Sequence, residues 1–210
     1  MGTHYNIQAV SIILKERKGK YKRKTLETEV EVKINLDGKG ISNLQTEIYF
    51  LNHMLTLFAR HGIFDLEIKA KGDLEVDYHH TIEDIGICLG EAIKKALQDK
   101  KGIKRYGFTI LPMDESLVQV ALDLSGRGQL IYGVQFKQER VGSFEVGLVE
   151  EFFKALSYHA GMTLHINLLY GKNSHHIIEA IFKAFGRALD EATREDNRLD
   201  NIPSTKGIID

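Results

Sequence analysis

The sequence predicts an α+β protein with internal duplication, in which two similar halves, each a β-sheet with two helices, pack as one unit. Segments that alternate like strands and segments with helical spacing follow one another in the same order twice. Shifts of 96 and 98 residues superpose motifs of the first half on the second, as duplication would produce. No stretch rich in Pro, Gly or Ser separates the halves. We therefore expect a single domain over residues 1–210, with repeats at about 20–100 and 108–195.

The first half is expected to begin with one strand over residues 20–36, because charged and β-branched residues alternate there. Apolar residues at helical spacing predict a helix over 48–60, with Gly62 placed to end it. Alternation returns over 64–70 and predicts a second strand. Residues 81–98 carry apolar side chains three and four positions apart, which predicts a second helix.

The second half shows the same order of patterns. Alternation predicts strands over 116–124 and 130–136, and helical spacing predicts a helix over 146–159. A strand over 163–169 and a long helix over 177–192 complete this half. The duplication predicts the order strand, strand, helix, strand, helix for each half, although in the first half only one strand is assigned before the first helix.

Composition excludes several classes of protein. Apolar residues make up 43% and charged residues 27% of the chain, which excludes wholesale disorder. The formal net charge is −1, so no global basic field indicates nucleic acid, and the basic run 15–24 is expected to be a solvated hairpin or strand edge. Cys88 is the only cysteine, which rules out an intrachain disulfide and fits a reducing compartment.

Membrane insertion is also not expected. The longest uncharged run, 155–171, contains His, Asn and Gly residues, which makes it a poor membrane span. The N-terminal apolar stretch precedes its charges, which is the wrong order for a signal peptide. We therefore expect a cytoplasmic protein without a membrane or nucleic-acid partner.

Two copies of an HHxxE motif, at 79–83 and 175–179, open the second helix of each half. Positions i and i+4 share a helix face, so the first His and the Glu of one motif can hold one ion together. Adjacent residues point about 100° apart, so the two His of a pair are expected to reach different ions. The alternative is a surface His pair, which two copies at equivalent places make less favoured. The expected metal ligands of the motifs are His79, His80, Glu83, His175, His176 and Glu179.

Two more ligands are expected near the start of the first helix of each half. A shift of 98 residues lays His53 on Glu151, and both are ligand types. His165 on a predicted strand is the rival to Glu151, or else a core histidine. His61 and His159 lie at helix ends, where hydrogen bonding to carbonyl groups is the simple role, favoured here for His159. A mixed His and carboxylate set with no available Cys pair fits a catalytic ion similar to Mn²⁺.

Ordered motifs along most of the chain give the sequence a specific resemblance. They are TLET (25–28), LDGKG (36–40), FLNHML (50–55), GDLEVDYHHTIED (72–84), KGIKRYG (101–107), PMDES (112–116), DLSGR (123–127), TLHI (163–166), GKNSHHIIEAIFKAFGRAL (171–189) and PSTKG (203–207). With these motifs the sequence closely resembles the imidazoleglycerol-phosphate dehydratase family. The chain departs from the commoner family pattern at Asn52, Leu57 and Tyr78, among other positions, and none of these departures removes a ligand type of the HHxxE motifs.

The resemblance implies a fold and an activity. The implied fold is a duplicated α+β unit of the ribosomal protein S5 domain 2-like kind. The implied enzyme is a hydro-lyase of histidine biosynthesis, which converts D-erythro-imidazole-glycerol phosphate into imidazole-acetol phosphate and water. The resemblance also implies two Mn²⁺ ions per active site and a 24-subunit assembly with sites between subunits.

Roles for individual residues follow from the resemblance and from the chemistry. Two ions at the ring nitrogens would favour an imidazolate form of the substrate and help to expel hydroxide. The resemblance places Glu27 at the C–H proton and at the substrate, with Glu83 and Glu179 as further catalytic residues. The alternative for Glu27 is a solvated strand residue on the face of Glu29 and Glu31.

A phosphate ester needs cationic and N–H donors, and isolated Arg or Lys residues are otherwise solvated charges. The candidate substrate-binding residues are Glu27, His61, Arg105, Arg127, Lys183, Ser204, Thr205 and Lys206. Two rival functions remain at this point. A two-metal hydrolase would release phosphate, and a metal-organised assembly protein would need no phosphate site.

Overall fold

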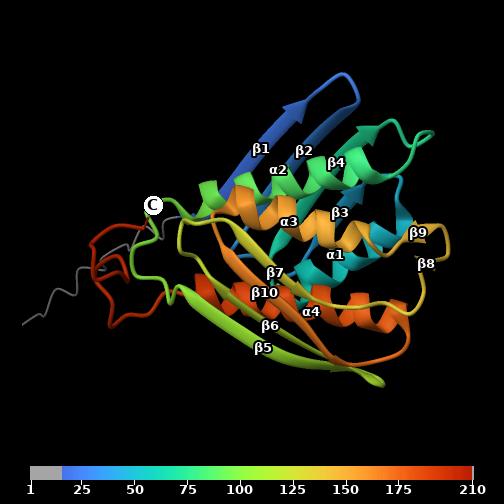
Figure 1. Cartoon of the computed structure of the whole chain (residues 1–210). Coiled ribbons are helices and arrows are strands. Elements are labelled where there is room, and N and C mark those ends of the chain that lie inside the picture. The colour runs from blue at the N-terminus through green and yellow to red at the C-terminus, as the bar shows by residue number, and fades with distance from the viewer. Residues whose placement is uncertain (1–15, 210) are drawn as a thin grey trace, which may run out of the picture.

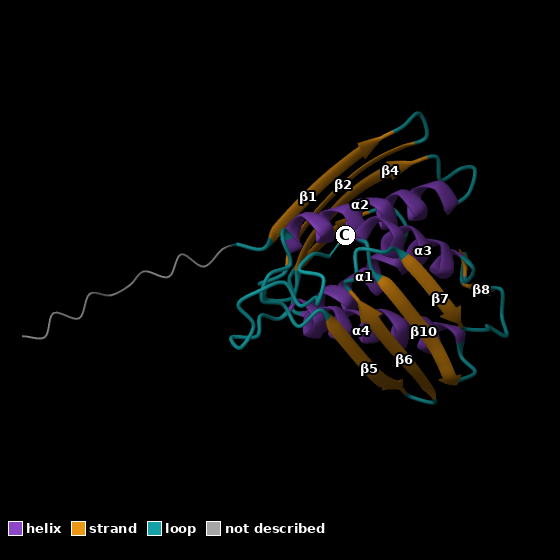
Figure 2. Ribbon diagram, turned by 60° about the vertical axis from the view of Figure 1, so that its left-hand side comes forward, coloured by secondary structure: helices purple, strands orange, loops and turns teal. Residues whose placement is uncertain are grey.

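Four helices lie between two four-stranded sheets in the computed structural model, which describes residues 16–209 (Figures 1 and 2). The N-terminal stretch that we do not expect to be a signal peptide lies largely outside the described residues. Among those residues, no helix is long and apolar enough to cross a membrane. Buried apolar side chains from both halves form one cluster.

Each half contributes one sheet and two helices. The first half runs β1 (Lys18–Lys24), β2 (Thr28–Asn35), β3 (Ser42–Gln45), α1 (Tyr49–Gly62), β4 (Asp65–Gly72) and α2 (His79–Leu97). The second half runs β5 (Tyr106–Met113), β6 (Ser116–Asp123), β7 (Gln129–Gly133), β8 (Arg140–Val141), β9 (Phe144–Glu145), α3 (Leu148–Ala160), β10 (Thr163–Tyr170) and α4 (Ser174–Thr193). The sheet orders β1-β2-β4-β3 and β5-β6-β10-β7 are equivalent, and in each sheet only the last pair is parallel. The predicted duplicated α+β fold is confirmed.

The contact of helix with sheet repeats residue for residue. A Cβ atom on Gly19 in β1 would lie 1.8 Å from the carbonyl oxygen of Ala92 in α2. A Cβ atom on Gly107 in β5 would lie 1.9 Å from the carbonyl oxygen of Ala188 in α4. Each helix therefore touches the backbone of its edge strand at a position that only glycine can fill.

The halves meet through pairs of helices. In α2, Cβ atoms on Gly86 and Gly90 would lie 2.7 and 2.6 Å from carbonyl oxygens of α3. In α4, a Cβ atom on Gly186 would lie 2.6 Å from the carbonyl oxygen of Phe58 in α1. The rings of Phe58 and Phe185 stack beside that crossing, with centroids 5.3 Å apart. Close helix crossings thus join the first half to the second.

The prediction of one strand over residues 20–36 is wrong. The chain turns at 25–27, where the Thr25 hydroxyl accepts the backbone N–H groups of Glu27 and Thr28. Residues 18–35 therefore form the hairpin of β1 and β2, and Glu27 lies in its turn and not on a strand face. Lys side chains of this hairpin pair with Glu side chains of β2, as in Lys22–Glu29 at 2.6 Å.

Other boundaries also differ from the predicted order. The strands β3 and β5 and the small β8–β9 hairpin were not predicted, so each half contains more strands than expected. Gly62 does not end α1 as a left-handed cap, because Ile63 takes that conformation. Gly62 instead lies against α4, where its Cβ would be 2.9 Å from the carbonyl oxygen of Gly186.

Candidate functional site

The N-terminal ends of the four helices lie at one end of the molecule, beside the β8–β9 hairpin (Figure 1). The ring of Phe50 at the start of α1 contacts both Phe144 of β9 and His175 of α4. His79 at the start of α2 lines a pocket with residues of β8, β9 and α3. Both HHxxE motifs therefore open their helices at this end, as predicted.

The first group of ligand-type side chains joins α1 to α4. The ligand atoms of His53, His175 and Glu179 all lie within 4.8 Å of one another. Glu179 is buried, and its Oε2 lies 3.4 Å from His175 Nε2 and 3.8 Å from His53 Nε2. Its Oε1 lies 2.5 Å from Nζ of Lys183. Burial acts to raise the pKa of Glu179, but the Lys183 hydrogen bond and nearby positive groups outweigh it, and the pKa is lowered.

The second group joins the β1–β2 turn to α2. The ligand atoms of Glu27, Asp73 and His80 also lie within 4.8 Å of one another. His80 Nδ1 lies 3.0 Å from Asp73 Oδ2 and 3.8 Å from Glu27 Oε2. The hydrogen bond to Asp73 raises the pKa of His80. Oδ1 of Asp73 is buried and has no hydrogen-bond partner among the described residues.

The remaining predicted ligands do not form a compact group in one chain. His79 and Glu151 line the same pocket at the start of α3. Glu83 is half-buried on α2, one turn after His79. His176 Nδ1 lies 2.7 Å from Glu115 Oε2, and this contact raises the pKa of His176 and lowers that of Glu115 to about 2.

The two His of each pair separate as the helical geometry requires. The rings of His79 and His80 are 6.2 Å apart at 90°, and those of His175 and His176 are 6.3 Å apart at 79°. His175 joins the group with His53, whereas His176 turns to Glu115. The structure thus sends adjacent histidines to different groups.

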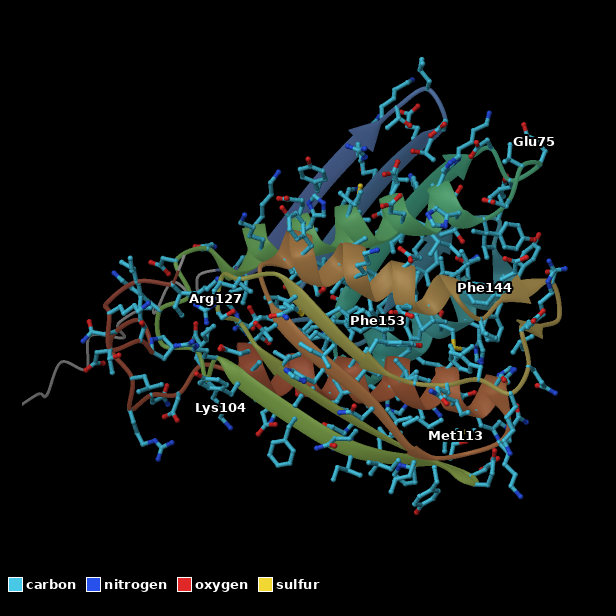
Figure 3. All side chains as sticks on the ribbon, in the orientation of Figure 1. Glu75, Lys104, Met113, Arg127, Phe144 and Phe153 are labelled. Atoms are coloured by element: carbon cyan, nitrogen blue, oxygen red, sulfur yellow. The ribbon has the colours of Figure 1, made fainter. Side chains whose placement is uncertain are left out.

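The candidate phosphate residues divide between two ends of the chain. Lys183 lies on the His53 side, at Glu179. Arg105 and Arg127 lie at the opposite end; Figure 3 shows Arg127 and Lys104 far from Met113, Phe144 and Glu75. The backbone N–H of Arg105 bonds Ala192, near the end of α4, so it lies about 25 Å along that helix from His175 at 1.5 Å per residue.

Arg105 is not free for a phosphate in this chain. Its guanidinium donates to both oxygens of Asp123, at 2.7 and 3.1 Å, and to the carbonyl of Pro203 at 2.7 Å. It thereby fastens the segment that carries Ser204, Thr205 and Lys206 beside the end of α4, and these last three residues are partly or fully exposed. Arg127 has an exposed side chain near the end of α3.

The other candidate histidines are placed clearly. His165 lies on β10 between the buried Leu164 and Ile166, so its side chain faces the outside of the sheet, away from the helix starts. Glu151 is therefore the better placed of the two rivals. His159 lies 3.2 Å from Glu91 and does not bond a helix carbonyl. Burial and then the charge of Lys183 lower the pKa of His61, which therefore faces α4.

Sequence reasoning missed three acidic residues at this end. Asp73 and Glu115 each contact the second His of a motif. Asp84 is buried and accepts hydrogen bonds from Nε of Arg23, at 2.7 Å, and from the hydroxyl of Thr28. All three lie in the motifs by which the sequence resembles its family. For Glu115 the sequence also contains a specific signal, because the internal repeat lays it on the candidate residue Glu27.

Fold and site together define a class, that of duplicated α+β proteins with imidazole and carboxylate groups at shared helix starts. The chain belongs to the imidazoleglycerol-phosphate dehydratase family, whose model matches residues 46–189. It is 59% identical to the imidazoleglycerol-phosphate dehydratase of Acetivibrio thermocellus and 60% identical to that of Caldanaerobacter subterraneus subsp. tengcongensis, over 92% of this chain and 100% of each relative.

Solved structures agree with the family assignment. The imidazoleglycerol-phosphate dehydratase of Staphylococcus aureus superposes with a TM-score of 0.78 at 43% identity, over 85% of this chain and 99% of the other. The structure of the Pyrococcus furiosus IGPD in complex with (S)-C348 superposes with a TM-score of 0.78 at 38% sequence identity, over 90% of this chain and 99% of the other. The predicted hydro-lyase of histidine biosynthesis is confirmed.

Proposed function

We propose that this chain dehydrates D-erythro-imidazole-glycerol phosphate to imidazole-acetol phosphate in a metal-dependent reaction. Family membership supports the substrate and the reaction. The observation that carries the metal dependence is the group of His53, His175 and Glu179, whose ligand atoms lie within 4.8 Å of one another.

The donor sets fit divalent ions. Imidazole and carboxylate ligands together suit Mn²⁺, and the only cysteine of the chain, Cys88, is buried in α2 away from them. His53, His175 and Glu179 would hold one ion, and His79, Glu83 and Glu151 are their repeat equivalents for a second. His80 and His176 are further ligands, because each extends from its helix in a different direction from the first His of its motif. Two bound Mn²⁺ ions would supply Lewis acidity toward the ring nitrogens of the substrate and favour its imidazolate form.

The chain's own residues have distinct tasks in this proposal. Glu27 lies in an exposed turn 3.8 Å from His80 and accepts the proton from the C–H bond of the substrate. Hydroxide leaves from the neighbouring carbon, so the proton and the hydroxide account for the water released. Lys183 attracts the phosphate from its position beside Glu179, and His61 faces α4 from the last turn of α1. Glu83 and Glu179 keep the charge near the ions balanced.

The site is completed by further copies of the chain. Arg105 lies about 25 Å along α4 from His175, too far for one small substrate to bridge within one chain. Arg127 and residues 204–206 lie at the same end of the chain as Arg105. Association that places the arginine end of one copy beside the histidine end of another removes this difficulty, and the family resemblance predicts a 24-mer. An apolar row on the outer face of β5 supports association, because Tyr106, Phe108 and Ile110 are 58%, 63% and 52% exposed.

A turnover assay tests the proposal directly. The purified chain, loaded with Mn²⁺, is given imidazole-glycerol phosphate with and without a chelator, and keto product and free phosphate are both measured. Keto product that forms only without chelator, with no phosphate release, is expected. Turnover that survives complete metal removal would refute the metal dependence, and two bound ions without turnover would refute the assigned reaction.

A further inference from the structure

The two halves differ in the carboxylate at their first β-turn. A shift of 88 residues lays β2 on β6, and both strands alternate buried and half-buried residues in the same phase. The same shift lays Glu27 on Glu115. These glutamates are therefore repeat equivalents, but their side chains have different contacts.

Both oxygen atoms of Glu115 are engaged. Oε2 lies 2.7 Å from Nδ1 of His176. Oε1 accepts the backbone N–H groups of Lys172 and Asn173 at 3.2 and 2.8 Å, and the hydroxyl of Ser116 at 3.1 Å. The turn before α4 therefore holds this carboxylate, and the carboxylate in turn holds the imidazole ring of His176.

In the first half a different residue holds the histidine. Asp73 Oδ2 lies 3.0 Å from Nδ1 of His80, whereas the nearest oxygen of Glu27 is 3.8 Å away. Asp73 directly follows β4, and Gly171 directly follows β10 at the equivalent position. The carboxylate that contacts the histidine thus comes from the end of β4, and the side chain of Glu27 is left 57% exposed.

We infer that Asp73 and Glu115 are positioning residues, which fix the rings of His80 and His176 with Nδ1 protonated and present Nε2 to a metal ion. A neutral imidazole carries one proton, so a carboxylate at Nδ1 leaves Nε2 as the free lone pair. The inference rests on the metal-dependent function proposed above. It also separates two repeat-equivalent glutamates, because Glu115 orients a ligand whereas Glu27 is free to meet the substrate.

Metal affinity tests the inference without reference to turnover. Zn²⁺ and Mn²⁺ binding by the full chain is measured by equilibrium dialysis, and circular dichroism verifies the fold of each variant. Asp73→Ala and Glu115→Ala should keep the number of ions per chain but weaken affinity by about 10–100-fold, the usual effect of losing a carboxylate behind a histidine ligand. Asp73→Asn, whose amide oxygen still accepts a hydrogen bond from the Nδ1–H group of His80, should recover most of the affinity. Glu27→Ala, the repeat-equivalent control, should bind metal as tightly as the unaltered chain.

Several results would overturn the inference. Loss of a whole ion per chain in Asp73→Ala would make Asp73 a direct ligand. Unchanged affinity in Asp73→Ala and Glu115→Ala, or an equal loss in Glu27→Ala, would remove the assigned roles. If Glu115→Ala does not fold, the two Asp73 variants decide the result.

Failure of the proposed function gives a different result. If the unaltered chain binds neither ion, its metal dependence fails. Histidine ¹⁵N spectra of the metal-free protein then test ring orientation alone. Loss of the Nδ1-protonated form of His80 in Asp73→Ala would support the inference, and an unchanged spectrum would refute it.

Discussion

Replacing Asp84 by Ala should reduce both stability and turnover, because this buried carboxylate connects α2 to the turn that carries Glu27. Asp84 accepts hydrogen bonds from Nε of Arg23, at 2.7 Å, and from the hydroxyl of Thr28. The same hydroxyl lies 3.2 Å from that of Thr25, which accepts the backbone N–H of Glu27. Removal of Asp84 therefore loosens the turn at its base.

The size of the effect follows from these contacts. A hydrogen bond to a charged group contributes about 1.5–3 kcal/mol. The Arg23 side chain is 41% exposed, so water replaces part of its bond, and Thr28 keeps Thr25 as a partner. We expect a loss of about 2–3 kcal/mol in the free energy of unfolding, or a fall in melting temperature of roughly 4–12 °C for a chain of this size. Displacement of a catalytic group by about 1 Å costs up to 100-fold, so kcat should fall by roughly 10–100-fold with KM little changed.

Thermal unfolding followed by circular dichroism, at fixed protein concentration, measures the first effect, and steady-state kinetics measures the second. Thr28→Val retains the strand and the volume but loses the hydroxyl, and should lower stability by about 1 kcal/mol. Glu31→Ala removes the half-buried partner of the exposed Lys20 side chain and serves as the control, with a change below about 0.5 kcal/mol. Native stability together with native kcat in Asp84→Ala would refute the positioning argument.

Four further predictions address other parts of the molecule. Lys183→Ala should raise KM by about tenfold or more, since it removes a charge beside Glu179, and an unchanged KM and kcat in steady-state assays would return Lys183 to a structural role. His80→Ala should lower bound metal per chain, and full metal content by elemental analysis would exclude His80 as a ligand. Gly186→Val should lower the free energy of unfolding by more than about 3 kcal/mol in a denaturation experiment, because its Cβ would lie 2.6 Å from the Phe58 carbonyl oxygen. The control Gly147→Ala should be neutral, because no atom lies within 4 Å of the added Cβ. Phe108→Asp should reduce the assembled fraction in sedimentation velocity, Lys71→Asp on the other sheet should not, and equal assembly of the two variants would show that the β5 face is not an interface.

The sequence predicted the helices and the repeat well and the edge strands poorly, for a physical reason. Buried faces of α2 and α4 leave a clear helical spacing of apolar residues. In β5 three large apolar residues, Tyr106, Phe108 and Ile110, face outward, and Gly107 faces the core against α4. The alternation of apolar and polar residues therefore does not indicate a strand there. The backbone of α4 lies so close to β5 that glycine occupies the inward-facing position where an apolar side chain would otherwise mark the buried face. The strand β3 has only four residues, too few for a pattern.

The candidate site was predictable as far as residue types and helical spacing determine it. The spacing of the HHxxE motifs predicted that adjacent histidines diverge, and the rings do diverge. Which acid contacts which histidine depends on turns that the pattern did not resolve. An interpretation of residues 20–36 as one strand hides the turn of Glu27. Without β5, the 88-residue shift that relates Glu27 to Glu115 is easily overlooked, although the sequence contains it. The distance between Arg105 and the motifs required the packing of α4 as well.

The repeat also explains why the Asp84 contacts occur in only one half. Asp84 follows the motif glutamate Glu83, and the residue that follows Glu179 is Ala180, so the second half has no carboxylate at this position. There the side chain of Glu115 is fastened directly by backbone N–H groups. A residue that only orients a histidine can be held by its own side chain, whereas a residue that exchanges a proton with substrate must keep its carboxylate free. The turn of Glu27 is accordingly held through its backbone and through Thr28, which is the arrangement expected if proton transfer takes place in the first half alone.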